Sequence, residues 1–331
     1  MIKNREGLVF VAILIAVIAV LPAVIVLPFS KASTESIELN ETQETQLDLT
    51  DQPTVQVMRS ASGQIEEVPL EQYVVSVVSS EVPASFELEA IKAQALAART
   101  YIVQKLVNGG ATEEYDVTDT VQHQVYKNMD ELRSAWGVDY SWKINKIKQA
   151  VQETRGQIIT YSGQPITAQF FSTSNGYTEN AEDYWQNEIP YLKSVQSPWD
   201  ENSPEYLEQQ ILTRTEVVNK LGIDQQAIQV SNTVRTDSHR IKEITISGKT
   251  FSGREVRELL GLRSNDFTIE VKGDHIIFTT KGYGHGVGMS QYGANGMAEA
   301  GSDYKEIVKH YYKGVEISDI QEIIGSLSAM N

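Results

Sequence analysis

The stretch SSEVPASFELEAIKAQALAARTY, residues 79–101, decides the fold. From Ala90 onward its only charged residues are Lys92 and Arg99, and small alanines take the positions that a surface helix fills with charge. A helix without a charged face is buried on most of its sides. We therefore predict a long buried helix over about residues 85–106, around which the domain is built.

The two cations of this helix need partners, because an unpaired buried charge is very costly. Two explanations fit the spacing of Lys92 and Arg99. Each cation could form a structural ion pair with a carboxylate of the core. Alternatively, the two could form a cationic wall beside Glu81.

Glu81 itself stands between the apolar run VVSVV and Pro83. A glutamate at a helix end is ordinarily solvated, because Glu is rarely buried without a partner. Apolar neighbours would instead raise its pKa by desolvation and suit it to general acid catalysis. The stretch alone leaves both interpretations open.

The N-terminus carries the signal of a membrane anchor. Residues 8–28 contain no charge and reach about the 20 residues that a membrane helix needs. Lys3 and Arg5 precede them, so residues 1–7 should stay in the cytoplasm. Residues 29–53 are polar and acidic, which is typical of a flexible linker. Residues 54–331 are then expected to form an extracytoplasmic domain.

Within that domain, helical and strand patterns do not alternate regularly. This indicates an α+β fold with a mixed, largely antiparallel sheet around the long buried helix, and a possible subdomain around residues 205–275. The segments TVQVMRSASGQIEEVP and FTIEVKGDHIIFTTKG read as hairpins. Thr213 with Glu216 and Ser252 with Glu255 have the spacing of capping boxes.

Composition excludes several functions. The net charge of −16 argues against nucleic acid as a partner, because phosphates repel such a protein. The absence of cysteine rules out disulfides and thiolate metal sites. The five histidines show no paired spacing, so we predict neither a metal nor a cofactor.

The glycine-rich stretch KGYGHGVGMSQYGANG, residues 281–296, suits close approach of the backbone to a ligand. His285 within it could be a hydrogen-bonding site residue or a satisfied core histidine. A serine nucleophile, Ser172 or Ser174, paired with His285 is conceivable. Without a G-x-S-x-G elbow, a polar turn is the better explanation of FFSTSNG.

Several segments together resemble the stage II sporulation protein D family over nearly the whole chain. They are SSEVPASFELEAIKAQALAARTYIV, DTVQHQVY, FFSTSNGYTENAEDYW, YLKSVQSPWD, GREVRELLGLRSNDF and KGYGHGVGMSQYGANGMA. The resemblance implies Glu81 as the catalytic acid. It implies a second group as substrate-binding residues, namely Lys92, Arg99, Ser174, His285 and Gln291. Some relatives bind zinc with histidine and cysteine in the segment matching VQHQVY, but here only His123 remains.

The same resemblance implies a membrane-anchored peptidoglycan lytic transglycosylase. Such an enzyme cleaves the bond between N-acetylmuramic acid and N-acetylglucosamine and leaves a 1,6-anhydro end. The implied partners are glycan strands and the stage II sporulation proteins P and M, at the engulfing mother-cell membrane of the septum. The family also reaches amidase enhancers, so the alternative is a non-catalytic, glycan-binding activator of another cell-wall hydrolase.

Overall fold

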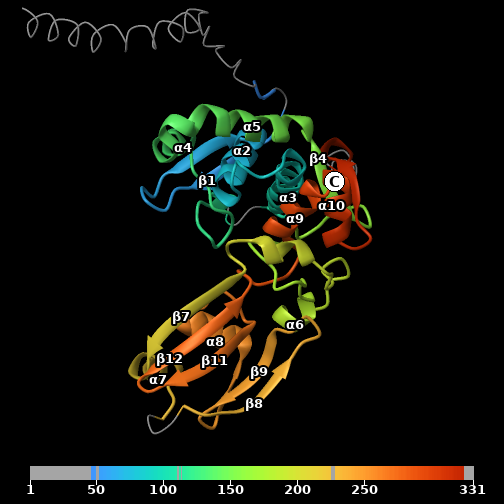
Figure 1. Ribbon diagram of the computed structural model, residues 1–331. Helices are drawn as coiled ribbons and strands as arrows, with labels where there is room; N and C mark the ends of the chain where they lie inside the picture. Colours follow the sequence, from blue (N-terminus) through green and yellow to red (C-terminus); the bar gives the residue numbers. More distant parts are fainter. Residues whose placement is uncertain (1–45, 50–51, 110–111, 113, 225–227, 324–331) are drawn as a thin grey trace, which may run out of the picture. The chain divides into compact units, whose positions relative to one another are not determined.

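The computed structural model describes residues 46–49, 52–109, 112, 114–224 and 228–323 (Figure 1). Residues 45–331 cluster as one compact unit. The expected cytoplasmic segment, membrane anchor and most of the acidic linker lie outside the described residues. Within the described residues, no helix combines the length and the apolar character that crossing a membrane requires.

The first half of the unit is mainly helical. Its elements are β1 (Thr54–Met58), β2 (Ile65–Pro69), α2 (Leu70–Glu81), α3 (Leu88–Val107), β3 (Val117–Thr118), α4 (Met129–Trp136), α5 (Tyr140–Glu153), β4 (Gln157–Tyr161), β5 (Gln164–Pro165), β6 (Phe170–Phe171) and α6 (Ala181–Trp185).

The second half contains the longer strands. Its elements are β7 (Leu207–Thr213), α7 (Arg214–Leu221), β8 (Val230–Arg235), β9 (Ile241–Ile246), β10 (Lys249–Ser252), α8 (Gly253–Leu260), β11 (Phe267–Lys272), β12 (His275–Lys281), β13 (Met289–Ser290), α9 (Gln291–Glu299), α10 (Tyr304–Tyr311) and β14 (Glu316–Asp319).

The predicted buried helix is confirmed as α3. Its alanines 93, 95, 97 and 98 have no exposed surface. One side of α3 packs into a core with α2 and α5, and the other side packs into a second core with β4, α9 and α10. The helix begins at Leu88, later than expected, because the chain turns at Pro83, whose carbonyl accepts from the Phe86 amide.

The α+β class is confirmed, but the strands form five small sheets within the described residues rather than one. Both expected hairpins are present as β1–β2 and β11–β12. Both expected capping boxes begin helices, at Thr213 and Ser252. Most pairs are antiparallel, and the parallel ones, β1–β3 and β6–β13, are only two residues long. Strands this short cannot extend into a continuous sheet.

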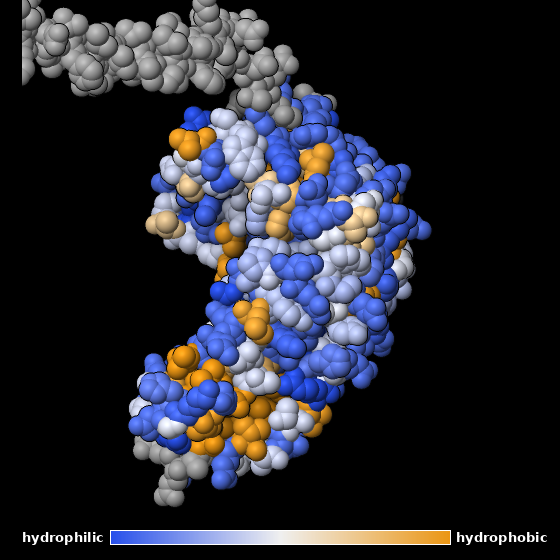
Figure 2. Space-filling model, in the orientation of Figure 1, coloured by the Kyte–Doolittle hydropathy of each residue, from blue (hydrophilic) through white to orange (hydrophobic). Residues whose placement is uncertain are grey.

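Helices α7 and α8 and the strands β7, β9, β10, β11 and β12 enclose a third core of their own, and the exposed strand β8 pairs with β9 at its edge. The six strands form two antiparallel three-stranded sheets, β11-β12-β7 and β10-β9-β8. Figure 2 shows the surface hollowed between this part and the part that carries α2 and α3. The segments that connect the two parts, residues 162–206 and 282–290, supply four of the residues that line the candidate site, namely Ala168, Gln169, Phe170 and His285.

Candidate active site

A pocket of about 330 Å³ lies at the end of α2. It is lined by Glu81, Tyr101, Val121, Gln122, His123, Gln124, Val125, Ala168, Gln169, Phe170 and His285. These residues come from the end of α2, from α3, from the loop after β3, from the segment around β6 and from the glycine-rich stretch. The pocket therefore gathers four of the segments that carry the family resemblance.

Glu81 is the last residue of α2, because Val82 is already extended and Pro83 follows. Its carboxylate is partly buried, and its Oε1 accepts a hydrogen bond of 3.3 Å from the Val125 amide. Burial raises the pKa of Glu81, while the Val125 amide and the Gln291 side chain oppose that rise. The raised pKa expected from the apolar flanks is therefore present, and its main cause is desolvation.

Two buried amide groups lie beside this carboxylate. Gln291, the first residue of α9, lies against Glu81 and stabilises its carboxylate, although its buried Nε2 reaches no acceptor in full hydrogen-bond geometry within the described residues. Gln124 lines the pocket and its Oε1 accepts from the Tyr73 hydroxyl at 3.2 Å, whereas its Nε2 is also without a partner there. Buried donors without partners are costly, so a ligand oxygen would stabilise both.

His285 lines the same pocket and is packed among aromatic rings. Its ring centroid lies 5.6 to 5.8 Å from those of Phe171, Tyr184 and Trp185. Its Nδ1 accepts from the Val287 amide at 3.1 Å. Burial, with the positive charges of Arg257 and Arg240, lowers the pKa of His285 to about 3. His285 is thus a neutral imidazole at neutral pH.

Arg99 does not reach the pocket, which corrects its expected role as a substrate-binding residue. Its side chain has no exposed surface. It forms a two-pronged ion pair with Glu71, with Nε–Oε1 and Nη2–Oε2 distances of 2.9 and 2.7 Å. It also donates to the carbonyls of Val151 and Gln157. The structural ion pair is the explanation that the structure supports.

Lys92 is likewise turned away from Glu81. Its ammonium lies 2.7 Å from Glu89 and 2.5 Å from Glu153, and 5.8 Å from the centre of the Tyr304 ring. Burial would lower the pKa of Lys92, but its hydrogen bonds to Glu153 and Glu89 raise it overall. The cationic wall is therefore absent from the residues that line the Glu81 pocket.

The expected role of Ser174 in substrate binding is also corrected, because the structure gives this residue a structural role. It is completely buried, and its hydroxyl donates to Asp200 Oδ2 at 2.7 Å. Asp200 also accepts from Ser197 and from Ser290, which is the N-cap residue of α9. Within the described residues, no hydrogen bond joins His285 to either serine of FFSTSNG. The hypothetical serine nucleophile thus lacks its base.

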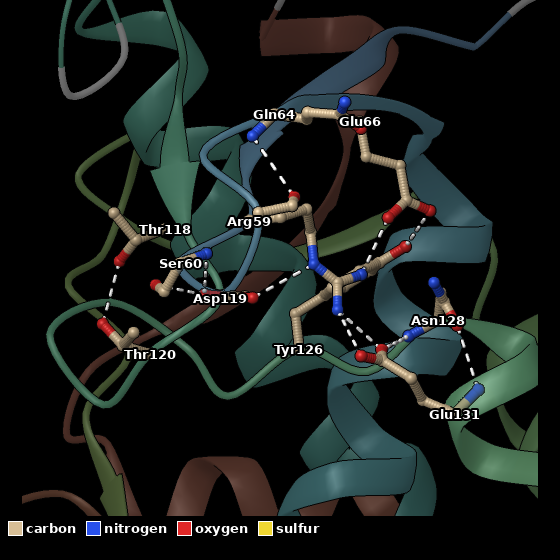
Figure 3. Close-up of polar contacts among 11 residues, drawn as sticks. Arg59, Ser60, Gln64, Glu66, Thr118, Asp119, Thr120, Tyr126, Asn128 and Glu131 are labelled. Carbon is tan, nitrogen blue, oxygen red and sulfur yellow. Dashed lines mark hydrogen bonds and ion pairs between the residues drawn. The ribbon is translucent and has the colours of Figure 1, made fainter. Parts of the chain in front are cut away.

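The loop that carries Gln124 and Val125 to Glu81 is held by Arg59 (Figure 3). The Arg59 guanidinium lies 3.0 Å from Asp119, 2.8 Å from Glu66 and 2.6 Å from Glu131. It also lies 5.0 Å from the centre of the Tyr126 ring. This network fixes both ends of the loop. The sequence does not reveal this network, because Arg59 lies sixty residues from Asp119.

Three further pocket residues are not among the predicted site residues, although each lies in a segment that carries the family resemblance. Tyr101, Gln124 and Phe170 line the pocket beside the predicted residues. His123 does so too, with its Nδ1 accepting from the Thr118 amide at 3.2 Å. In the part of the chain that the structure describes, no three His, Asp or Glu side chains come together as metal ligands.

Comparisons with known proteins agree on one family. Residues 58–161 match the family model described as Stage II sporulation protein. Stage II sporulation protein D of Bacillus subtilis (strain 168) is 46% identical over 98% of this chain and 99% of its own length. The protein of that name from Bacillus amyloliquefaciens is 45% identical over 96% of each. An amidase enhancer of Bacillus subtilis is 30% identical over 73% of this chain and 40% of its own length. This chain therefore belongs to the stage II sporulation protein D family, a family of sporulation proteins.

Proposed function

We propose that this chain is a peptidoglycan lytic transglycosylase that uses Glu81 as its single acid and base. One observation carries the proposal. Glu81 is the sole carboxylate among the described residues that line the pocket, and burial raises its pKa. A raised pKa keeps a proton available for the oxygen of the leaving sugar.

A single carboxylate distinguishes this chemistry from ordinary glycoside hydrolysis. Hydrolases place two carboxyl groups on either side of the scissile bond, one of them to activate water or attack the sugar. In a lytic transglycosylase the 6-hydroxyl of N-acetylmuramic acid attacks instead. Glu81 first gives its proton to the leaving oxygen, and the resulting carboxylate then takes the proton of that hydroxyl. The product is a 1,6-anhydro sugar, and no water is consumed.

The rest of the lining suits a neutral sugar. It contains no lysine or arginine, and the pKa values of its histidines, His123 and His285, are lowered by burial. Gln124 in the lining and Gln291 next to Glu81 offer amide N–H groups for acetamido or hydroxyl oxygens. Tyr101 and Phe170 offer ring faces. The lactyl and peptide groups of the strand would then point out of the pocket.

A second function is favoured by the relative named as an amidase enhancer. In that case the pocket would hold a glycan strand without cleaving it, and a partner hydrolase would act.

For either function we propose that residues 8–28 form a membrane anchor and that the rest of the chain lies outside the cytoplasm. We also propose the stage II sporulation proteins P and M as partners. Protease added to protoplasts should then digest the chain beyond the linker, and protection of the bulk would contradict this topology.

The decisive experiment is mass spectrometry of peptidoglycan incubated with the full-length chain in detergent. We expect 1,6-anhydro ends from the wild type and almost none from Glu81→Gln, because acid and base assistance contributes about 10²–10⁴-fold in rate. Glu87→Gln is the matched control, since Glu87 is a nearby exposed acid outside the pocket. Reducing ends would indicate hydrolysis. Release only with an added amidase would favour the activator, and a Glu81→Gln variant that cleaves normally would refute the role of Glu81.

A further inference from the structure

A second pocket, of about 420 Å³, lies between α6 and the segment formed by β9 and the start of α8. It is lined by Glu182, Asp183, Tyr184, Trp185, Gln186, Ile241, Lys242, Ser252, Arg254 and Asn265. None of these residues lines the Glu81 pocket. Five of them belong to the stretch ENAEDYWQ, residues 179–186, whose chemistry the proposed reaction does not use.

Two aromatic rings form one wall of this pocket. The Tyr184 ring is held from two sides, by the Arg254 guanidinium 5.0 Å from its centre and by an Arg257 hydrogen bond of 3.2 Å to its hydroxyl. Trp185 meets it edge-on, with ring centroids 5.3 Å apart. Trp185 is partly exposed, and Gln186 ends the helix directly after it in the left-handed conformation. The indole is therefore a fixed, accessible ring.

The pocket also contains hydrogen-bond acceptors that lack donors. Asn265 is buried, with only 5% of its surface exposed, and its Oδ1 has no hydrogen-bond partner among the described residues. Glu182 accepts from Lys193 through Oε1 at 2.8 Å, but its buried Oε2 has none there. Leaving a buried acceptor unsatisfied is costly. A ligand that brings O–H or N–H donors would remove this cost.

Charge excludes an ionic ligand as the preferred occupant. The two acids and two bases of the lining sum to zero formal charge, from Glu182, Asp183, Lys242 and Arg254. Lys242 is paired with Asp183 at 2.9 Å, and Arg254 is paired with Glu258 at 2.8 Å. A neutral ligand rich in hydroxyl groups, with an apolar face for the indole, fits this combination. That is the chemistry of a sugar ring.

The pocket adjoins the Glu81 pocket through His285. That imidazole lines the Glu81 pocket, and its centroid lies 5.6 Å from Trp185 and 5.8 Å from Tyr184. From this arrangement we infer that the pocket is a second sugar subsite, in which Trp185 stacks on an N-acetylated sugar ring while Asn265 and Glu182 accept its O–H and N–H groups. The inference rests on the proposed function, because it assigns a further ring of the same glycan strand to this position.

Binding of chitotetraose, a neutral tetramer of N-acetylglucosamine, tests the subsite apart from cleavage. Calorimetry on the full-length Glu81→Gln chain removes turnover from the measurement. Adding Trp185→Ala should weaken binding about tenfold, since a stacked aromatic ring is lost. Trp142→Ala is the matched control: Trp142 is 47% exposed on α5, lines neither pocket, and should leave binding unchanged.

Asn265→Leu separates binding from folding. The substitution removes a buried oxygen that has no partner, so the melting temperature should stay the same or rise while binding weakens. Unchanged binding in both Trp185→Ala and Asn265→Leu would overturn the subsite, as would absence of chitotetraose binding by the parent. The release of anhydro ends by the wild type reports independently on the Glu81 reaction. If anhydro ends are released but the two variants bind normally, the subsite is refuted. If the variants bind weakly but no anhydro ends are released, the proposed reaction is refuted.

Discussion

Removal of the Arg99 guanidinium should lower the free energy of unfolding of the protein without acting directly on the reaction. Arg99 lies inside the core and donates hydrogen bonds to both oxygens of Glu71 and to the carbonyls of Val151 and Gln157. Arg99→Met fills most of the volume but leaves a carboxylate that is itself 3% exposed without its counter-ion. Breaking one side of such a buried pair costs about 3–5 kcal/mol.

A double variant removes both members of the ion pair. In Arg99→Met with Glu71→Leu, no buried charge remains unpaired, and an apolar replacement of a buried ion pair is often neutral or stabilising by about 1–4 kcal/mol. We therefore expect the double variant to recover most of the stability that Arg99→Met loses. Since whole domains are stable by only about 5–15 kcal/mol, the single variant should show a clear shift.

Urea unfolding of the wild type, both single variants and the double variant gives the coupling free energy. The release of anhydro ends, measured on the same samples, gives the activity of the folded fraction. If the double variant has wild-type stability but cleaves more than tenfold slower, Arg99 acts on the substrate and the structural assignment is refuted. If Arg99→Met alone costs less than about 1 kcal/mol, the pair is not buried as described.

Three further outcomes follow from the structure. Lys92→Met should cost less than about 1 kcal/mol and leave cleavage unchanged, as unfolding and product assays would show, because its ion pairs are partly exposed. Glu81→Gln should be more stable than the wild type at pH 7 but not at pH 3.5. A carboxyl whose pKa is raised in the folded state contributes stability below its unfolded pKa of about 4.3, and this stability is lost as the pH rises through the folded pKa. Equal gains in the urea midpoint at both pH values would contradict this prediction. Gly286→Ala should lower the melting temperature more than Gly301→Ala: both have positive φ, but a Cβ at Gly286 lies 2.6 Å from Arg240 Cζ, whereas Gly301 faces open space.

The local elements were predictable because their signals are local. The alanine-rich helix α3, the capping boxes at Thr213 and Ser252, and the hairpin turning at Gly273 each depend on residues within a few positions of one another. Residue types at short spacing determine such features. For Glu81, the apolar run and Pro83 predict a carboxylate at the end of a helix, while its burial depends on segments far away in the sequence.

The partners of the charged and polar side chains were decided by tertiary structure alone. Arg99 pairs with Glu71 across 28 positions, and Ser174 bonds Asp200 across 26. The sequence shows that a buried cation needs a counter-ion, but many carboxylates could serve, and only the packing of α2 against α3 selects one. The pocket depends on the same kind of contact, because the loop with Gln124 reaches Glu81 only through packing between distant segments. The spacing of residues along the chain does not determine the distances between side chains of such distant segments. The site therefore depends on how the core folds.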